Sequence, residues 1–127
     1  MSWGIEHLLR QAEEKEGNYE WLEAVESYKN ALSLLPQDEF LKVGDVYEHM
    51  SYAFYRAAMQ SRSSSEFMSR ISQAVVSCEQ ARASYAKLTA TTRVPLILRC
   101  NATVALVHYW LESSALERKN MRMSVGN

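Results

Sequence analysis

The feature that most constrains this chain is a segment that opens with a turn, closes with a proline and has a helical pattern between them. The turn begins at Gly17 and the stop is Pro36. Between them Ala24, Tyr28 and Ala31 follow one another at spacings of four and three, which places them on one face of a helix. Alanines on that face let a neighbouring helix approach closely. The segment therefore predicts a helix packed tightly against its neighbours.

The rest of the chain is also expected to be helical. It has only four glycines and two prolines, and no alternating run of β-branched and aromatic residues is long enough for a sheet. Apolar residues recur instead with helical periodicity. We predict an all-α domain over residues 1–119 and a frayed polar tail over 120–127. The expected helices cover about 2–16, 19–35, 39–60, 65–88 and 94–118.

Several polar residues stand where helices should begin. Asn18 and Asp38 are candidate N-caps for the second and third helices. Ser63 and Glu66 form a capping-box pattern at the start of the fourth. Pro95 is expected in the first turn of the fifth helix, where a proline is best tolerated.

An internal repeat of 50 residues supports an arrangement in hairpins. Ala74, Cys78 and Ala81 reproduce the four-and-three spacing seen in the second helix. The same shift superposes apolar positions of the third and fifth helices: Val46 on Leu96, Tyr47 on Ile97, Met50 on Cys100 and Phe54 on Val104. The chain would then hold two helical hairpins and the first helix of a third.

Two helices resemble the halves of a tetratricopeptide repeat. The segment from Gly17 to Pro36 is similar to the second helix of that motif. The third helix is similar to the first one, with large, small and aromatic residues at the motif positions Tyr47, Met50, Ser51, Ala53 and Phe54. The resemblance implies an α–α superhelix of antiparallel hairpins that acts as a non-enzymatic protein-interaction scaffold. The first 36 residues also resemble the opening hairpin of a microtubule-interacting-and-transport domain, which grips amphipathic helices.

The tetratricopeptide resemblance further implies that the first helix of each hairpin lines a concave groove. In the third helix the residues on that side would be Asp45, Glu48, Tyr52, Tyr55 and Arg56. Tyrosines flanked by charges of both signs suit an extended peptide or a partner helix, whose identity the sequence does not reveal. The alternative is that both tyrosines pack against the first or the fifth helix.

The fifth helix is apolar on nearly all sides. Either it lies at the centre of a bundle, or a neighbouring helix is missing, from a longer array or a second copy. For self-association we expect contacts through Leu98, Leu106 and Trp110. Charge is also split: residues 1–50 carry eleven acidic and four basic side chains, whereas residues 51–127 carry four and ten. The simpler interpretation is two solvated surfaces; the other is attraction between copies.

Chemistry-bearing motifs are absent from the sequence. His7, His49 and His108 lie on different expected helices without metal-ligand spacing, so we expect no metal, no cofactor and no enzymatic activity. Scattered arginines and a pI near 6.3 argue against a nucleic-acid surface. The two cysteines are expected as buried free thiols of a cytoplasmic protein.

Neither a signal peptide nor a membrane span is expected, since the apolar run at 102–111 is too short to cross a bilayer. A second function remains open. A helical bundle with these residues could instead enclose a small apolar ligand, in which case the aromatic lining would be Trp21, Tyr47, Phe54 and Trp110.

Overall fold

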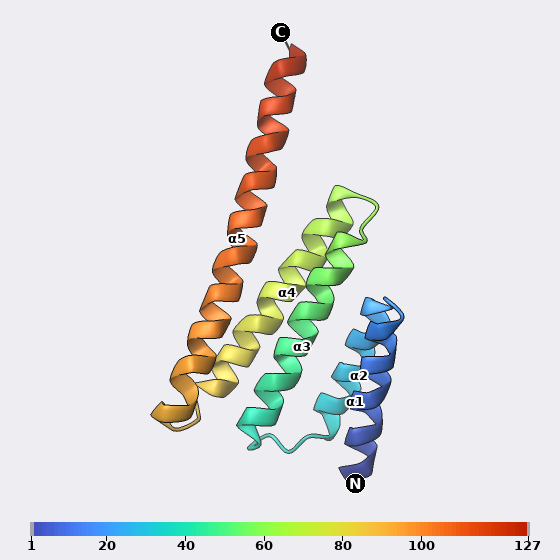
Figure 1. The fold of residues 1–127 in the computed structure, drawn as a ribbon, viewed down its shortest axis with the longest axis vertical. Helices are drawn as coiled ribbons and strands as arrows, with labels where there is room; N and C mark the ends of the chain where they lie inside the picture. The colour runs from blue at the N-terminus through green and yellow to red at the C-terminus, as the bar shows by residue number, and fades with distance from the viewer. Residues whose placement is uncertain (1, 127) are drawn as a thin grey trace.

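The computed structural model describes the backbone of residues 2–126, and the side chains of residues 4–109 and 111–113. Over residues 2–126 the chain forms five α-helices and no strand, as the sequence predicts. The helices are α1 (Ser2–Gly17), α2 (Trp21–Leu34), α3 (Phe40–Met59), α4 (Ser64–Tyr85) and α5 (Ala90–Gly126). Figure 1 shows them side by side in chain order, with α1 and α5 at opposite edges.

Each helix packs mainly on the helices before and after it in the chain. The most extensive packing joins α3 to α4, and α1 to α2 is next. Short connections between the helices enforce this antiparallel order. The fold is therefore a row of helices in which α3 lies in the middle and α5 has its neighbour α4 on one side (Figure 1).

Small residues on facing helices make the core. Ala24, Tyr28 and Ala31 of α2 are all buried, and so are their 50-residue counterparts Ala74, Cys78 and Ala81 on α4. The main cluster joins α1, α2 and α3, with one alanine from α4. Two smaller clusters hold α4 against α5 and against the C-terminal half of α3. The predicted small-residue faces are confirmed as the faces along which the helices meet.

The turn between α1 and α2 differs from the prediction. Gly17 is the last residue of α1 and has an ordinary helical backbone, while Tyr19 takes the left-handed conformation with φ of 62°. The Glu20 N–H donates to the Lys15 carbonyl at 2.8 Å and the Tyr19 N–H to the Glu16 carbonyl at 3.0 Å. These two bonds form a Schellman motif, so Asn18 closes α1 rather than capping α2.

One of the three predicted N-caps is confirmed and two are wrong. Ser63 caps α4 as predicted, because its Oγ accepts the Glu66 N–H at 3.1 Å. The Glu66 carboxylate accepts a hydrogen bond from the Ser63 hydroxyl at 3.5 Å and pairs with Arg70 at 2.9 Å. Glu20 and Glu39 are the N-cap residues of α2 and α3, and neither side chain makes a capping hydrogen bond. The predictions of Asp38 as the cap of α3 and Asn18 as the cap of α2 are therefore wrong.

Helix α5 is longer than expected at both ends. It begins at Ala90, and the Thr89 carbonyl accepts the Arg93 N–H at 2.8 Å, so Pro95 lies in the second turn rather than the first. It continues to Gly126, through residues 120–126 that the sequence predicts to fray. The apolar run at 102–111 is too short to span a membrane. The longer segment Ala90–Ser113 of α5 could nevertheless cross a membrane, judged by its length and composition alone. Only 12 % of its most apolar stretch is buried.

Candidate functional site

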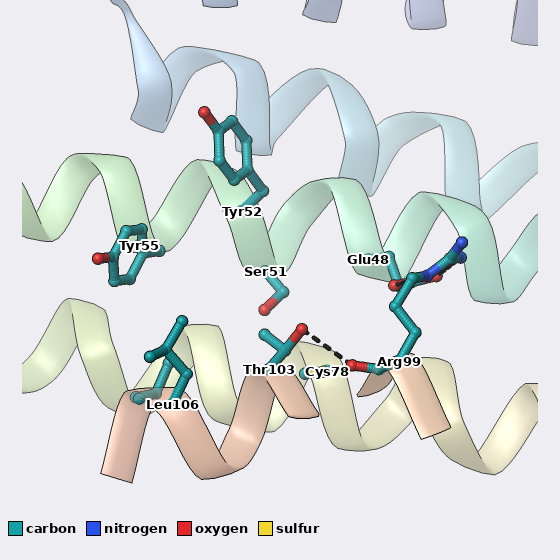
Figure 2. Close-up of a pocket in the computed structure, with 9 residues that line it drawn as sticks. Glu48, Ser51, Tyr52, Tyr55, Cys78, Arg99, Thr103 and Leu106 are labelled. Atoms are coloured by element: carbon teal, nitrogen blue, oxygen red, sulfur yellow. Dashed lines mark hydrogen bonds and ion pairs between the residues drawn. The ribbon is translucent and has the colours of Figure 1, made fainter. Parts of the chain in front are cut away.

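A groove of about 360 Å³ opens between α3 and α5, with α4 as its floor. We call it the α3–α5 groove. It is lined by Glu48, Ser51, Tyr52, Tyr55, Cys78, Arg99, Thr103, Leu106 and Val107. Figure 2 shows that these residues come from three helices that are well separated in the sequence. Most of the lining is carbon, so the groove is suited to an apolar side chain rather than to a polar ligand.

The α3–α5 groove has an apolar end and a charged end. At one end Tyr55 of α3 and Leu106 of α5 stand on opposite walls (Figure 2). At the other end Glu48 and Arg99 close the gap between the same two helices (Figure 2). A ligand lying along the groove would therefore contact aromatic and aliphatic carbon at one end and the Glu48–Arg99 ion pair at the other.

The charged end is a bidentate ion pair between helices. The Arg99 Nε donates to Glu48 Oε2 at 2.9 Å, and its Nη2 donates to Oε1. Arg99 is half-exposed while Glu48 is mostly covered, so the guanidinium carries the solvent-facing side of the pair. Hydrogen bonding to Glu48 raises the pKa of Arg99, so the guanidinium stays positively charged.

Tyr85 links this ion pair to α4, the helix that forms the floor of the α3–α5 groove. Its hydroxyl lies 2.6 Å from Glu48 Oε1 and 2.5 Å from Asp45 Oδ1, so one hydroxyl proton serves two carboxylates. The ring is completely buried. Burial, followed by the hydrogen bonds to Asp45 and Glu48, raises the pKa of Tyr85. The network Asp45–Tyr85–Glu48–Arg99 ties α3, α4 and α5 together.

Tyr52 is held from the side of α2. Its ring meets the Trp21 ring edge-on at 5.7 Å between centroids. The Arg56 guanidinium lies over Trp21 at 5.0 Å and over Tyr52 at 5.9 Å, and it donates to the Tyr52 hydroxyl at 3.3 Å. These contacts fix one wall of the α3–α5 groove before any ligand is present.

The structure places the predicted partner-binding residues in three settings. Glu48, Tyr52 and Tyr55 line the α3–α5 groove. Asp45 lines a smaller recess of about 190 Å³ between α1 and α3, and its carboxylate is taken by Tyr85. Arg56 packs on Trp21, at the boundary with α2.

The residues predicted for self-association also separate. Leu98 is exposed on α5, whereas Leu106 is half-exposed and borders the groove. The side chain of Trp110 lies outside the described residues.

Sequence reasoning missed the contribution of α5 to the α3–α5 groove, which comes from Arg99, Thr103 and Val107. The 50-residue repeat held a signal for it, because it equates α3 with α5 as first helices of successive hairpins. Recesses between such helices then occur twice, between α1 and α3 and between α3 and α5.

Cys78 and Cys100 are both free thiols buried between α4 and α5. The Cys78 Sγ donates to the Cys100 carbonyl at 3.5 Å. Burial raises the pKa of Cys78, and it raises the pKa of Cys100 to about 12. Both sulfurs are therefore protonated and weakly nucleophilic near neutral pH.

Three of the four aromatic residues expected around an enclosed ligand take part in packing, and the side chain of the fourth, Trp110, lies outside the described residues. Trp21 and Phe54 belong to the main core cluster, and Tyr47 packs against two clusters. None of these three lines the α3–α5 groove. Among the residues whose side chains are described, no three His, Cys, Asp or Glu side chains gather closely enough to hold a metal ion.

No family model matches the chain, and no curated protein and no solved structure is significantly similar to it. A function must therefore be inferred from the geometry of its own residues.

Proposed function

We propose that this chain is a non-enzymatic protein-interaction module of the tetratricopeptide-like type, which holds a segment of a partner protein in the α3–α5 groove. The observation that carries the proposal is the groove itself, in which Tyr52, Tyr55 and Leu106 offer exposed or half-exposed apolar surface beside the Glu48–Arg99 pair. Tyrosines contribute large contact area at a small entropic cost, which is why they are common in binding surfaces.

The chemistry of the groove indicates the kind of segment it binds. An apolar or aromatic side chain fits between Tyr55 and Leu106. A polar group further along the bound segment would reach the ion pair, where Arg99 faces solvent. We infer a short motif that combines a large apolar anchor with an acidic or amide residue.

The placement of the recesses supports the tetratricopeptide-like part of the proposal. Both recesses lie between first helices of successive hairpins, with a second helix beneath each of them. This agrees with the implication of the family resemblance that first helices line the concave side. The groove walls are fixed by the Trp21–Tyr52 contact and the Glu48–Arg99 pair, so binding would need little reordering of the domain.

Selection from a displayed random-peptide library tests this proposal. Peptides that bind the wild-type chain should share an apolar anchor, and Tyr52→Ala should weaken their binding at least tenfold. Tyr19→Ala is the matched control, because Tyr19 is an exposed tyrosine that lies outside the groove. Equal binding to both variants, or amide shifts on titration that avoid Ser51, Thr103 and Val107, would reject the groove as the binding site.

A further inference from the structure

Helix α5 has a second apolar face, opposite the face that packs on α4. Val94, Leu98, Ala102, Ala105 and Tyr109 are all exposed, and we call them the outer stripe. At 100° per residue they fall within about 80° of helix circumference, so they share one face over four turns. Leu98 is 61 % and Tyr109 is 63 % exposed. The opposite side of α5 is buried against α4 through Cys100 and Val107.

The 50-residue repeat shows what the outer stripe corresponds to. One set of residues on α3 faces α1 and α2; shifted by 50, it becomes the set on α5 that faces α4. The pairs are Val46 and Leu96, Met50 and Cys100, Phe54 and Val104, and Ala57 and Val107. The side of α5 that meets α4 is thus equivalent to the side of α3 that meets the preceding hairpin.

A second set on α3 faces α4, and its counterparts on α5 are exposed. On α3 the set comprises Gly44, Glu48, Ser51, Tyr55 and Ala58, which contact α4 through packing or hydrogen bonds. On α5 the equivalent residues are Val94, Leu98, Asn101, Ala105 and His108, all of them exposed. Helix α5 therefore presents the same side on which α3 packs against its antiparallel partner helix, and within the described part of the chain no helix covers that side.

Among the described side chains, the surface whose apolar character matches this side of α5 is the outer stripe itself. Among the residues with described side chains, four of the twelve exposed large hydrophobic residues lie on α5, and the other eight are distributed over three helices and the turn before α2. When a second copy of a chain covers such a stripe, an isologous two-fold contact lets the stripe of one copy pack against the same stripe of the other.

We propose that the outer stripe is a dimer interface, in which α5 of one copy packs antiparallel on α5 of a second copy. The stripe reads large, large, small, small, large, from Val94 to Tyr109. An axis between residues 101 and 102 brings Val94 opposite Tyr109 of the other copy and Leu98 opposite Ala105. The alanines then lie where the helices cross, which allows the backbones to approach closely. This surface is separate from the α3–α5 groove, although Leu106 borders both.

The charges on α5 agree with the antiparallel orientation. With this axis, Glu112 of one copy lies opposite residue 91 of the other, in the first turn of its α5. That turn contains no acidic residue of its own. A carboxylate close to a helix N-terminus is stabilised by the exposed amides and the helix dipole. A parallel pairing would instead bring the two Glu112 side chains together.

Light scattering after gel filtration tests the dimer with the full chain. Wild type should be a dimer in both low and high salt, and Leu98→Arg should be a monomer with unchanged helical circular dichroism. Val76→Arg is the matched control, because Val76 is an exposed apolar residue of α4 outside the stripe, and it should remain dimeric. A wild-type monomer, or a dimer that Leu98→Arg leaves intact, would overturn the proposal. So would a monomer that sediments with phosphatidylcholine vesicles, which would assign α5 to a membrane.

Cysteine cross-linking tests the orientation. Ala102→Cys lies beside the proposed axis and should form a disulfide-linked dimer under mild oxidation. Val94→Cys should not link to itself, because its two copies would lie about 22 Å apart along the helices. A mixture of Val94→Cys and Tyr109→Cys should cross-link. The native thiols are buried and serve as an internal background. Efficient self-linking of Val94→Cys would show a parallel pair and refute the antiparallel one.

Loss of the dimer and loss of peptide binding are separable. Leu98→Arg should still bind groove-selected peptides, since Leu98 does not line the groove, whereas Tyr52→Ala should still dimerise.

Discussion

The backbone of Gly44 on α3 lies directly against the ring of Tyr85 on α4. A β-carbon on residue 44 would stand 2.6 Å from Tyr85 Cδ1 and 2.8 Å from Cζ, and closer still to Cε1. Real β-carbons do not approach ring carbons this closely, so only glycine fits at this position. The contact lets the buried ring pack against the backbone of α3, with its hydroxyl between Asp45 and Glu48. A missing side chain on one helix thus positions the hydrogen bonds that join three helices.

Gly44→Ala is expected to destabilise the domain, although alanine is the better helix former by about 1 kcal/mol. Overpacking in a core costs about 1–3 kcal/mol, and here two hydrogen bonds resist displacement of the ring. We expect the free energy of unfolding, measured with urea, to fall by about 1–2 kcal/mol. Gly17→Ala is the matched control, because nothing lies within 4 Å of the added carbon, and it should be neutral or slightly stabilising. Equal effects of the two substitutions would contradict the steric argument.

Tyr19→Gly is expected to stabilise the domain. Tyr19 holds the left-handed position of the Schellman motif with φ of 62°, where a β-carbon costs about 1–2 kcal/mol. Its side chain is exposed, so little packing is lost on removal. We expect the free energy of unfolding to rise by roughly 1 kcal/mol, because the greater entropy of glycine in the unfolded chain offsets part of the relieved strain. Tyr19→Ala keeps the strained backbone and should match wild type in thermal unfolding; if it stabilises as much as glycine does, strain at this turn is not the cause.

Stability should fall at alkaline pH. Burial raises the pKa of Tyr28 and of Tyr85 above the ordinary tyrosine value of 10.0, and hydrogen bonds to carboxylates add to this. The folded state therefore favours the neutral phenols. The contribution of these neutral phenols to the free energy of unfolding is complete below about pH 10. It is lost as the pH rises further, because the unfolded chain releases protons that the folded chain retains. Each group contributes at most about 1.4 kcal/mol per pH unit.

Urea unfolding at about pH 8 and about pH 11 measures this dependence. Tyr85→Phe should lower stability at about pH 8 and flatten the decline above pH 10, since one of the two shifted phenols is gone. Identical slopes for wild type and Tyr85→Phe would show that the buried phenols do not govern the alkaline limit.

The two thiols should be inert in the native protein. Burial raises the pKa of Cys100 to about 12 and also raises that of Cys78, so little thiolate is present at neutral or mildly basic pH. Iodoacetamide should leave the mass of the folded chain unchanged and add two carbamidomethyl groups in urea. Rapid labelling of Cys78 alone under native conditions would mean that the floor of the α3–α5 groove opens to solvent.

Much of the fold follows from local pattern. The spacing of Ala24, Tyr28 and Ala31 correctly identifies a buried face, and the Ser63–Glu66 pair correctly identifies the start of α4. Both signals depend on residues within a few turns of one another. The turn before α2 is mispredicted because Gly17 is the obvious breaker by composition, whereas hydrogen bonds place the left-handed residue two positions later, at Tyr19.

The groove could be predicted only in part. The tetratricopeptide resemblance implies a groove lined by Tyr52 and Tyr55 of α3, and both line the α3–α5 groove. It does not predict Arg99, Thr103 and Val107, because their position depends on how α5 crosses α4 and faces α3. No periodicity within α5 shows which of its several apolar sides meets α4. Arg56 faces α2 for the same reason, since the Trp21 ring lies next to it only in the folded chain.

The sequence by itself determined that this chain is a set of amphipathic helices with small-residue faces, because helical periodicity, capping and breaking are properties of neighbouring residues. Only the tertiary structure decided that the Gly44 backbone packs against the Tyr85 ring, that Glu48 pairs with Arg99 and that Val94, Leu98 and Ala105 of α5 stay exposed. The physical reason is that these outcomes depend on close packing between residues some 40 to 50 positions apart, where distances of a few tenths of an ångström decide which contacts form.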